Sequence, residues 1–117
     1  MSRTKKSTNT RKKHKKVLKE AKGYRGHNSN LYRKAKEKVE RGRKHAYRHR
    51  REKKREFREL WIVRINAAAR REGTTYSQLM GGLRKADVEL NRKMLADIAV
   101  HDPDTFSELV DVAEDAM

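Results

Sequence analysis

Several residue types are absent or scarce in this chain of 117 residues. It contains no cysteine, which excludes disulfides, thiolate nucleophiles and zinc sites built on thiolates. It contains one proline and six glycines, so few positions can interrupt a helix. No run of about 18 apolar residues occurs, so we expect no membrane-spanning helix. No apolar segment follows the basic N-terminus, so we expect no secretory signal.

Acidic residues are scarce beside basic ones. The chain has 32 Lys and Arg against 16 Asp and Glu, a net charge of +16, and hydrophobic residues make up 34%. Residues 1–60 carry 25 Lys and Arg against 6 Glu, a net of +19, whereas residues 61–117 carry 7 against 10, a net of −3. A charge of this size predicts a polyanionic partner, most often nucleic acid. We therefore divide the chain into a basic extension, 1–56, and a compact domain, 57–117.

The predicted fold class is all-α, because no segment alternates apolar and polar residues over the length of a strand. Residues 1–10 read as an unfolded basic tail, and residues 11–22 as a helix that ends before Gly23. A turn over residues 23–30 follows. The architecture is then a long basic N-terminal helical extension and a small C-terminal helical bundle.

A single helix is predicted from Leu31 to about Glu72, and a break near Gly42 is the alternative. Its first half carries only a thin apolar line, and its end carries a broad apolar face that belongs to the bundle. The thin line consists of Leu31, Ala35, Val39 and Ala46, and the broad face of Phe57, Leu60, Trp61, Ile65, Ala68 and Ala69.

Three shorter helices are predicted after Gly73. Thr75 with Gln78 forms a capping-box pattern, Asp87 is the expected cap of the next helix, and Asp102 precedes a proline at a favoured first position. The buried faces are expected to be Tyr76, Leu79, Met80 and Leu83, then Leu90, Met94, Leu95, Ile98 and Ala99, then Phe106, Leu109, Val110 and Ala113.

Aromatic residues interleave with the basic clusters. Tyr24, Tyr32 and Tyr47 can stack on unpaired bases or pack locally, and both alternatives remain open. Phe57 and Trp61 are expected to pack in the core because they share its spacing. Arginine predominates over lysine in the second half of the extension, which favours folded RNA because guanidinium binds phosphate in two places and stacks on bases. A basic DNA-compacting protein is the alternative.

The sequence contains no pattern typical of a catalytic or metal-binding site. His45 and His49 lie four residues apart, but no third ligand is near and flanking arginines repel a cation. Gly81-Gly82 lacks the strand and helix that a phosphate loop needs. Nothing resembles a nucleophile beside its base. We therefore predict no enzyme activity, no cofactor, no metal and no small-molecule substrate.

Four blocks of residues resemble a known family. They are His14–Gly26, Tyr47–Arg51, Lys54–Arg70 and Asn91–Val100, and their spacing agrees as well. Together the blocks resemble the bacterial ribosomal large-subunit protein of the L-twenty family over nearly the whole chain. The first ten residues depart from the usual start of the family.

The resemblance implies a constituent of the large ribosomal subunit in the cytoplasm, bound to large-subunit ribosomal RNA and neighbouring ribosomal proteins. It implies a role in early subunit assembly and, in some bacteria, binding and repression of the protein's own messenger. Charge and aromatic pattern select as candidate RNA-binding residues Arg11, Lys12, Lys13, Arg33, Lys34, Arg41, Arg43, Lys44, Tyr47 and Lys53. Motif matches add His14, Lys15, Lys16, Lys19, Lys22, Tyr24, Arg25, Arg48, Arg50, Arg51, Lys54, Arg55, Arg58, Arg70, Asn91, Arg92 and Lys93.

Overall fold

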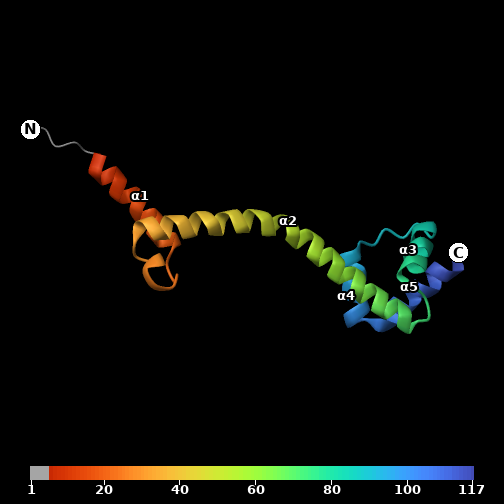
Figure 1. Ribbon diagram of the computed structural model, residues 1–117. Coiled ribbons are helices and arrows are strands. Elements are labelled where there is room, and N and C mark those ends of the chain that lie inside the picture. Colours follow the sequence, from red (N-terminus) through yellow and green to blue (C-terminus); the bar gives the residue numbers. More distant parts are fainter. Residues whose placement is uncertain (1–5) are drawn as a thin grey trace, which may run out of the picture. The chain divides into compact units, whose positions relative to one another are not determined.

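A computed structural model describes residues 6–117, and over this range the chain is helical and contains no strand (Figure 1). The all-α prediction is confirmed. None of the described helices is long and apolar enough to cross a membrane. The elements are α1 (Lys6–Glu20), the 3-10 helix η1 (Gly26–Asn28), α2 (Tyr32–Arg71), α3 (Tyr76–Lys85), α4 (Arg92–His101) and α5 (Pro103–Asp115).

The chain divides into two compact units, Met1–Arg51 and Glu52–Met117, and the division falls within α2. Each unit has its own cluster of buried apolar side chains. The boundary predicted between residues 56 and 57 marks the start of the segment that we expect to fold independently. It stays a prediction.

The first unit has a small core between α1 and the start of α2. Ala21, Ala35 and Val39 are buried, and Val17 and Leu18 pack against them. This cluster is too small to offset the entropy cost of ordering some fifty residues, since fixing a residue's backbone costs roughly 1–2 kcal/mol. Packing therefore holds the two helix segments together only weakly.

Helix α1 begins earlier than expected. Residues 1–5 lie outside the described part of the chain, but residues 6–10 are helical, so the prediction of an unfolded tail was wrong for them. Extending an existing helix by one residue is far easier than starting one, so a Lys-rich helix can continue through poorer helix formers. At the other end, Gly23 has φ +85°, which fits a glycine just beyond the helix.

Helix α2 is unbroken over 40 residues, so the alternative of a break at Gly42 was wrong. Of the thin apolar line, Ala35 and Val39 are buried, but Leu31 is half exposed and Ala46 is exposed. The packing against α1 therefore covers only the middle of that line.

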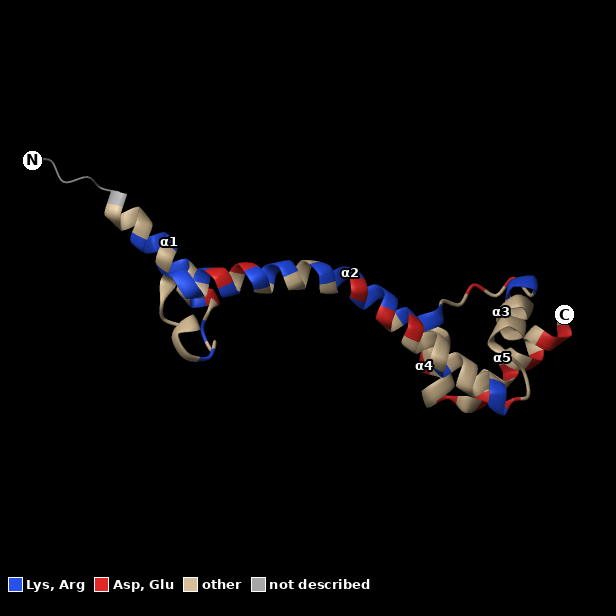
Figure 2. Cartoon of the chain, in the orientation of Figure 1, with Lys and Arg blue, Asp and Glu red and all other residues tan. Residues whose placement is uncertain are grey.

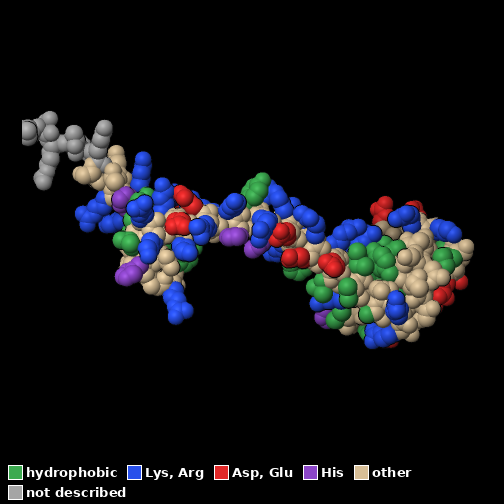
Figure 3. Space-filling model, viewed as in Figure 1, with side chains coloured by type: hydrophobic (Ala, Val, Ile, Leu, Met, Phe, Trp, Pro, Cys, Tyr) green, Lys and Arg blue, Asp and Glu red, His purple; other side chains and the backbone are tan. Residues whose placement is uncertain are grey.

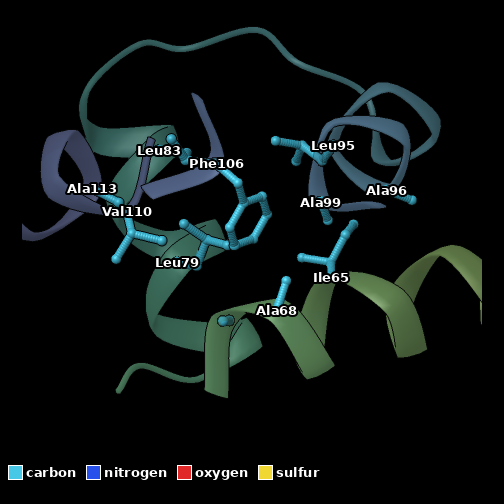
Figure 4. Packing of buried hydrophobic residues seen from close by; sticks show 11 residues of the cluster. Ile65, Ala68, Leu79, Leu83, Leu95, Ala96, Ala99, Phe106, Val110 and Ala113 are labelled. Atoms are coloured by element: carbon cyan, nitrogen blue, oxygen red, sulfur yellow. The ribbon is translucent and has the colours of Figure 1, made fainter. Parts of the chain in front are cut away.

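The core of the second unit lies between the end of α2 and the three shorter helices. Phe106 of α5 occupies its centre, with Leu79 of α3, Leu95 of α4 and Ile65 of α2 around it (Figure 4). All four side chains are fully buried. The prediction that the end of the long helix belongs to the bundle is confirmed.

Polar caps begin each of the short helices. Thr75 and Gln78 form the expected capping box at α3, and Asp102 accepts hydrogen bonds from Thr105 at α5. The Thr105 hydroxyl, and then its backbone N–H, hold the pKa of Asp102 below its ordinary value. The expectation that Asp87 caps α4 was wrong. Asn91 is the cap, because the connection continues past Asp87, whose backbone is left-handed with φ +57°.

Three residues expected in the core lie at the surface. Phe57 is 44% exposed, Leu60 41% and Met94 48%. Trp61 is half-buried against the core, and the Phe57 ring lies beside the Trp61 ring, with centroids 6.2 Å apart and planes tilted by 45°. The helical spacing of the apolar face was predicted correctly. However, the short helices cover α2 only from about Trp61 onwards. The first turn of the apolar face therefore has no helix to pack against.

Gly82 sets the distance between α3 and α5. An ideal Cβ at this residue would lie 2.7 Å from both the carbonyl carbon and the Cβ of Ala113. We expect Gly82→Ala to lower the free energy of unfolding by about 1–3 kcal/mol, because the helices must separate. Gly81→Ala is the matched control, since a Cβ there meets no atom within 4 Å, and it should add about 0.5–1 kcal/mol through helix propensity. Equal effects in denaturant titrations would contradict the argument.

Candidate nucleic-acid interface

The candidate RNA-binding residues lie on the surface of the described chain. All are exposed except His14 and Arg92, which are half-buried. Lys and Arg cover much of α1 and α2 (Figures 2 and 3), whereas α5 carries acidic residues and no Lys or Arg (Figure 2). The surface potential is therefore positive along the extension, where a polyanion is attracted.

Helix α1 presents a cationic face opposite its packed side. Lys12, Lys15, Lys16 and Lys19 are exposed and follow a spacing of three and four residues, which puts them on one side of the helix. Val17 and Leu18 pack toward α2 instead. The four ammonium groups repel one another in the free protein, and an RNA backbone removes that repulsion.

One aromatic pair joins α1 to α2. The rings of His14 and Tyr32 stack with centroids 3.6 Å apart and an interplanar angle of 16°. Of the two alternatives left open for Tyr32, local packing is therefore what the protein alone shows. The stack also explains why His14 is only half exposed, because one face of its ring is covered.

Tyr47 and Arg51 form a second local pair on the exposed part of α2. The guanidinium carbon of Arg51 lies 3.6 Å from the centre of the Tyr47 ring, and its Nη1 donates to the Tyr47 carbonyl oxygen at 2.9 Å. The Tyr47 side chain is still 56% exposed. A cation over one face leaves the aromatic edge and the remaining surface available for a base.

Several of the candidate cations already have partners within the chain. Arg43 donates to both carboxylate oxygens of Glu20, with distances of 2.7 Å to Oε1 and 3.2 Å from Nε to Oε2. Arg41 pairs with Glu37 at 2.7 Å. Both pairs are exposed, so they contribute little stability and can exchange for phosphate. The Arg43–Glu20 pair joins the end of α1 to α2.

At the start of α4, two of the three candidate residues form hydrogen bonds within the protein. The Asn91 side-chain oxygen accepts from the Met94 N–H at 2.9 Å, and Arg92 Nε donates to the Tyr76 hydroxyl at 2.8 Å. Only Lys93 of the three candidates is exposed without a hydrogen bond of this kind. Arg58 and Arg70, at the two ends of the bundle's part of α2, are exposed.

Two exposed arginines of α2, Arg64 and Arg71, were not among the candidate residues. They lie seven residues apart, which places them on the same face of the helix, and both line open hollows against α4. The helical spacing of the two arginines was the available signal. For metals, the described residues contain no group of three or more His, Asp or Glu that could hold an ion.

The comparisons with known proteins agree on one family. The family model described as Ribosomal protein L20 matches residues 3–109. The chain is 60% identical over 114 residues to the large ribosomal subunit protein bL20 of Carboxydothermus hydrogenoformans, covering 97% of both chains. It is 57% identical over 116 residues to that of Gloeobacter violaceus, covering 99% of this chain and 98% of the other. With exposed cations along α1 and α2 and a separate helical core, this chain belongs to the ribosomal protein L20 family.

Proposed function

We propose that the protein is a structural constituent of the large subunit of the cytoplasmic ribosome, that it binds large-subunit ribosomal RNA directly, and that it promotes early subunit assembly. The observation that carries this proposal is the division of charge, with net +19 over residues 1–60 and −3 over residues 61–117. Family membership supports the same assignment. The function requires binding and positioning and no chemical step.

The mechanism follows from the charges and the weak packing of the first unit. RNA segments that approach each other during assembly repel through their phosphates. Cationic helices between them offset this repulsion and release condensed counterions, so binding depends strongly on salt. Because the small cluster around Ala21, Ala35 and Val39 orders the extension only weakly, RNA supplies much of the free energy that fixes it. The second unit has its own core and offers a preformed surface.

Repression of the protein's own messenger is part of the same proposal. It would use the surface of the second unit, so that messenger and ribosomal RNA compete. A messenger leader that fails to compete with ribosomal RNA for the full chain would limit the function to the ribosome.

The test is association with the subunit. The full chain is expected to sediment with large-subunit particles. In a competition experiment at physiological salt, added structured ribosomal RNA should displace the protein from bound ribosomal RNA, and added duplex DNA should not. The physical reason is that the exposed arginines and Tyr47 can contact unpaired bases, which a duplex does not offer. Equal competition by DNA, together with no sedimentation, would favour a DNA-compacting protein.

A further inference from the structure

Two open hollows lie along α2 and α4 in the second unit, and Arg64 lines both. The first has a volume of about 440 Å³ and includes Trp61 and Met94 in its wall. The second has a volume of about 400 Å³ and includes Arg71 and Val100. We name the two together the α2–α4 groove. Volumes of roughly 300–1,000 Å³ are typical of sites that enclose a small ligand.

The lining of the groove combines apolar surface with cations. Met94 is 48% exposed and Val100 52%, so two large apolar side chains face solvent here. Exposed alanine and half-buried tryptophan extend this surface. Removing apolar surface of this kind from water lowers the free energy by roughly 25 cal/mol per Å². A flat apolar ligand would therefore gain free energy by covering it.

The charged groups of the groove indicate which ligand this is. Arg64, Lys93 and Arg71 bring three cations, and the lining contains one acid, Asp97. Asp97 Oδ1 lies 3.1 Å from Nδ1 of His101, so this carboxylate already has a contact within α4. The excess of cations suits a ligand that carries negative charge next to an apolar ring. An apolar protein segment would leave these cations without a partner.

We infer that the α2–α4 groove receives an unpaired nucleotide of the bound RNA, its base against the apolar wall and its phosphates beside Arg64, Lys93 and Arg71. Single-stranded bases are recognised by stacking on aromatic side chains or on arginine planes. Arg64 lines both hollows, so its guanidinium is available to a base that occupies either of them. The inference rests on the proposed function, because it names the part of the RNA that this surface takes.

The experiment uses the full chain and in vitro transcribed large-subunit ribosomal RNA, with chemical modification of bases as the readout. The wild-type protein should protect one unpaired base, or two adjacent ones, through the second unit. Arg64→Lys keeps the charge but removes the planar guanidinium, so this protection should disappear and affinity should fall about 10-fold, as for the loss of one stacked base. Arg84→Lys, at an exposed arginine of α3, should change neither.

A second variant occupies the groove instead of altering its chemistry. Met94→Asp places a carboxylate in the first hollow and should abolish the same protection, whereas Val112→Asp on α5, where Val112 is 43% exposed, should leave it. Melting midpoints of all variants verify folding. Full protection by both Arg64→Lys and Met94→Asp would overturn the inference, and so would unchanged RNA binding with weakened uptake into subunits, which would indicate a protein partner. If the wild-type chain binds no ribosomal RNA, the proposed function itself fails.

Discussion

Replacing Lys12, Lys15, Lys16 and Lys19 together by glutamine is expected to weaken binding to large-subunit ribosomal RNA by roughly 10³-fold, at about 1 kcal/mol for each phosphate contact. The four side chains are exposed on one face of α1, away from the apolar contacts with α2. The slope of log K against log salt should also fall by about 4, one for each lost phosphate contact. Filter binding or band-shift titrations between 50 and 200 mM salt measure both quantities.

A matched control separates local contact from total charge. Lys15→Gln/Lys16→Gln and Arg84→Gln/Lys85→Gln each remove two adjacent, exposed cations, from α1 and α3 respectively. The α1 pair should lower the salt slope by about 2, and the α3 pair should leave it unchanged. If both pairs lower the slope equally, RNA responds only to the net charge of the protein and α1 is not a specific contact surface.

Phe106→Ala should lower the free energy of unfolding by about 3–5 kcal/mol, the usual cost of truncating a buried phenylalanine. The ring is 2% exposed and lies at the centre of the second unit, among side chains from α2, α3 and α4. Small domains have a total stability of only about 5–15 kcal/mol, so much of it would be lost. Denaturant titration followed by the fluorescence of Trp61, the single tryptophan, reports on this core.

Phe57→Ala is the control for that measurement. It removes the same side chain from a position that is 44% exposed, so its effect on unfolding should stay within about 0.5 kcal/mol. A loss comparable to that of Phe106→Ala would mean that the core extends along α2 beyond Trp61, as the apolar spacing alone had suggested.

Much of the fold could be predicted because its signals are local. The capping box of Thr75 and Gln78, the Asp102-Pro103 start and the glycine after α2 depend on neighbouring residues, and all three occur as expected. The cap of α4 was not found in this way. Asp87 was expected, but the connection between α3 and α4 continues past it, and Asn91 caps the helix.

The candidate interface shows a different limit. Charge and spacing identified exposed lysines and arginines, but they could not show which of them already pair within the chain. Glu20 is 23 residues from Arg43 and reaches it only because α1 packs on α2. Likewise, Arg64 and Arg71 lie outside the basic clusters of the extension, and their place beside α4 is what makes them notable.

The sequence by itself determined the helical class, the separation of a +19 segment from a −3 segment, and hence a polyanionic partner. These follow from composition and period, which need no knowledge of long-range contacts. The tertiary structure decided which apolar side chains are covered, burying Phe106 and leaving Phe57 and Met94 at the surface. It also formed the α2–α4 groove. Burial depends on which elements meet in space, and a helical pattern states only that one face is available to meet something.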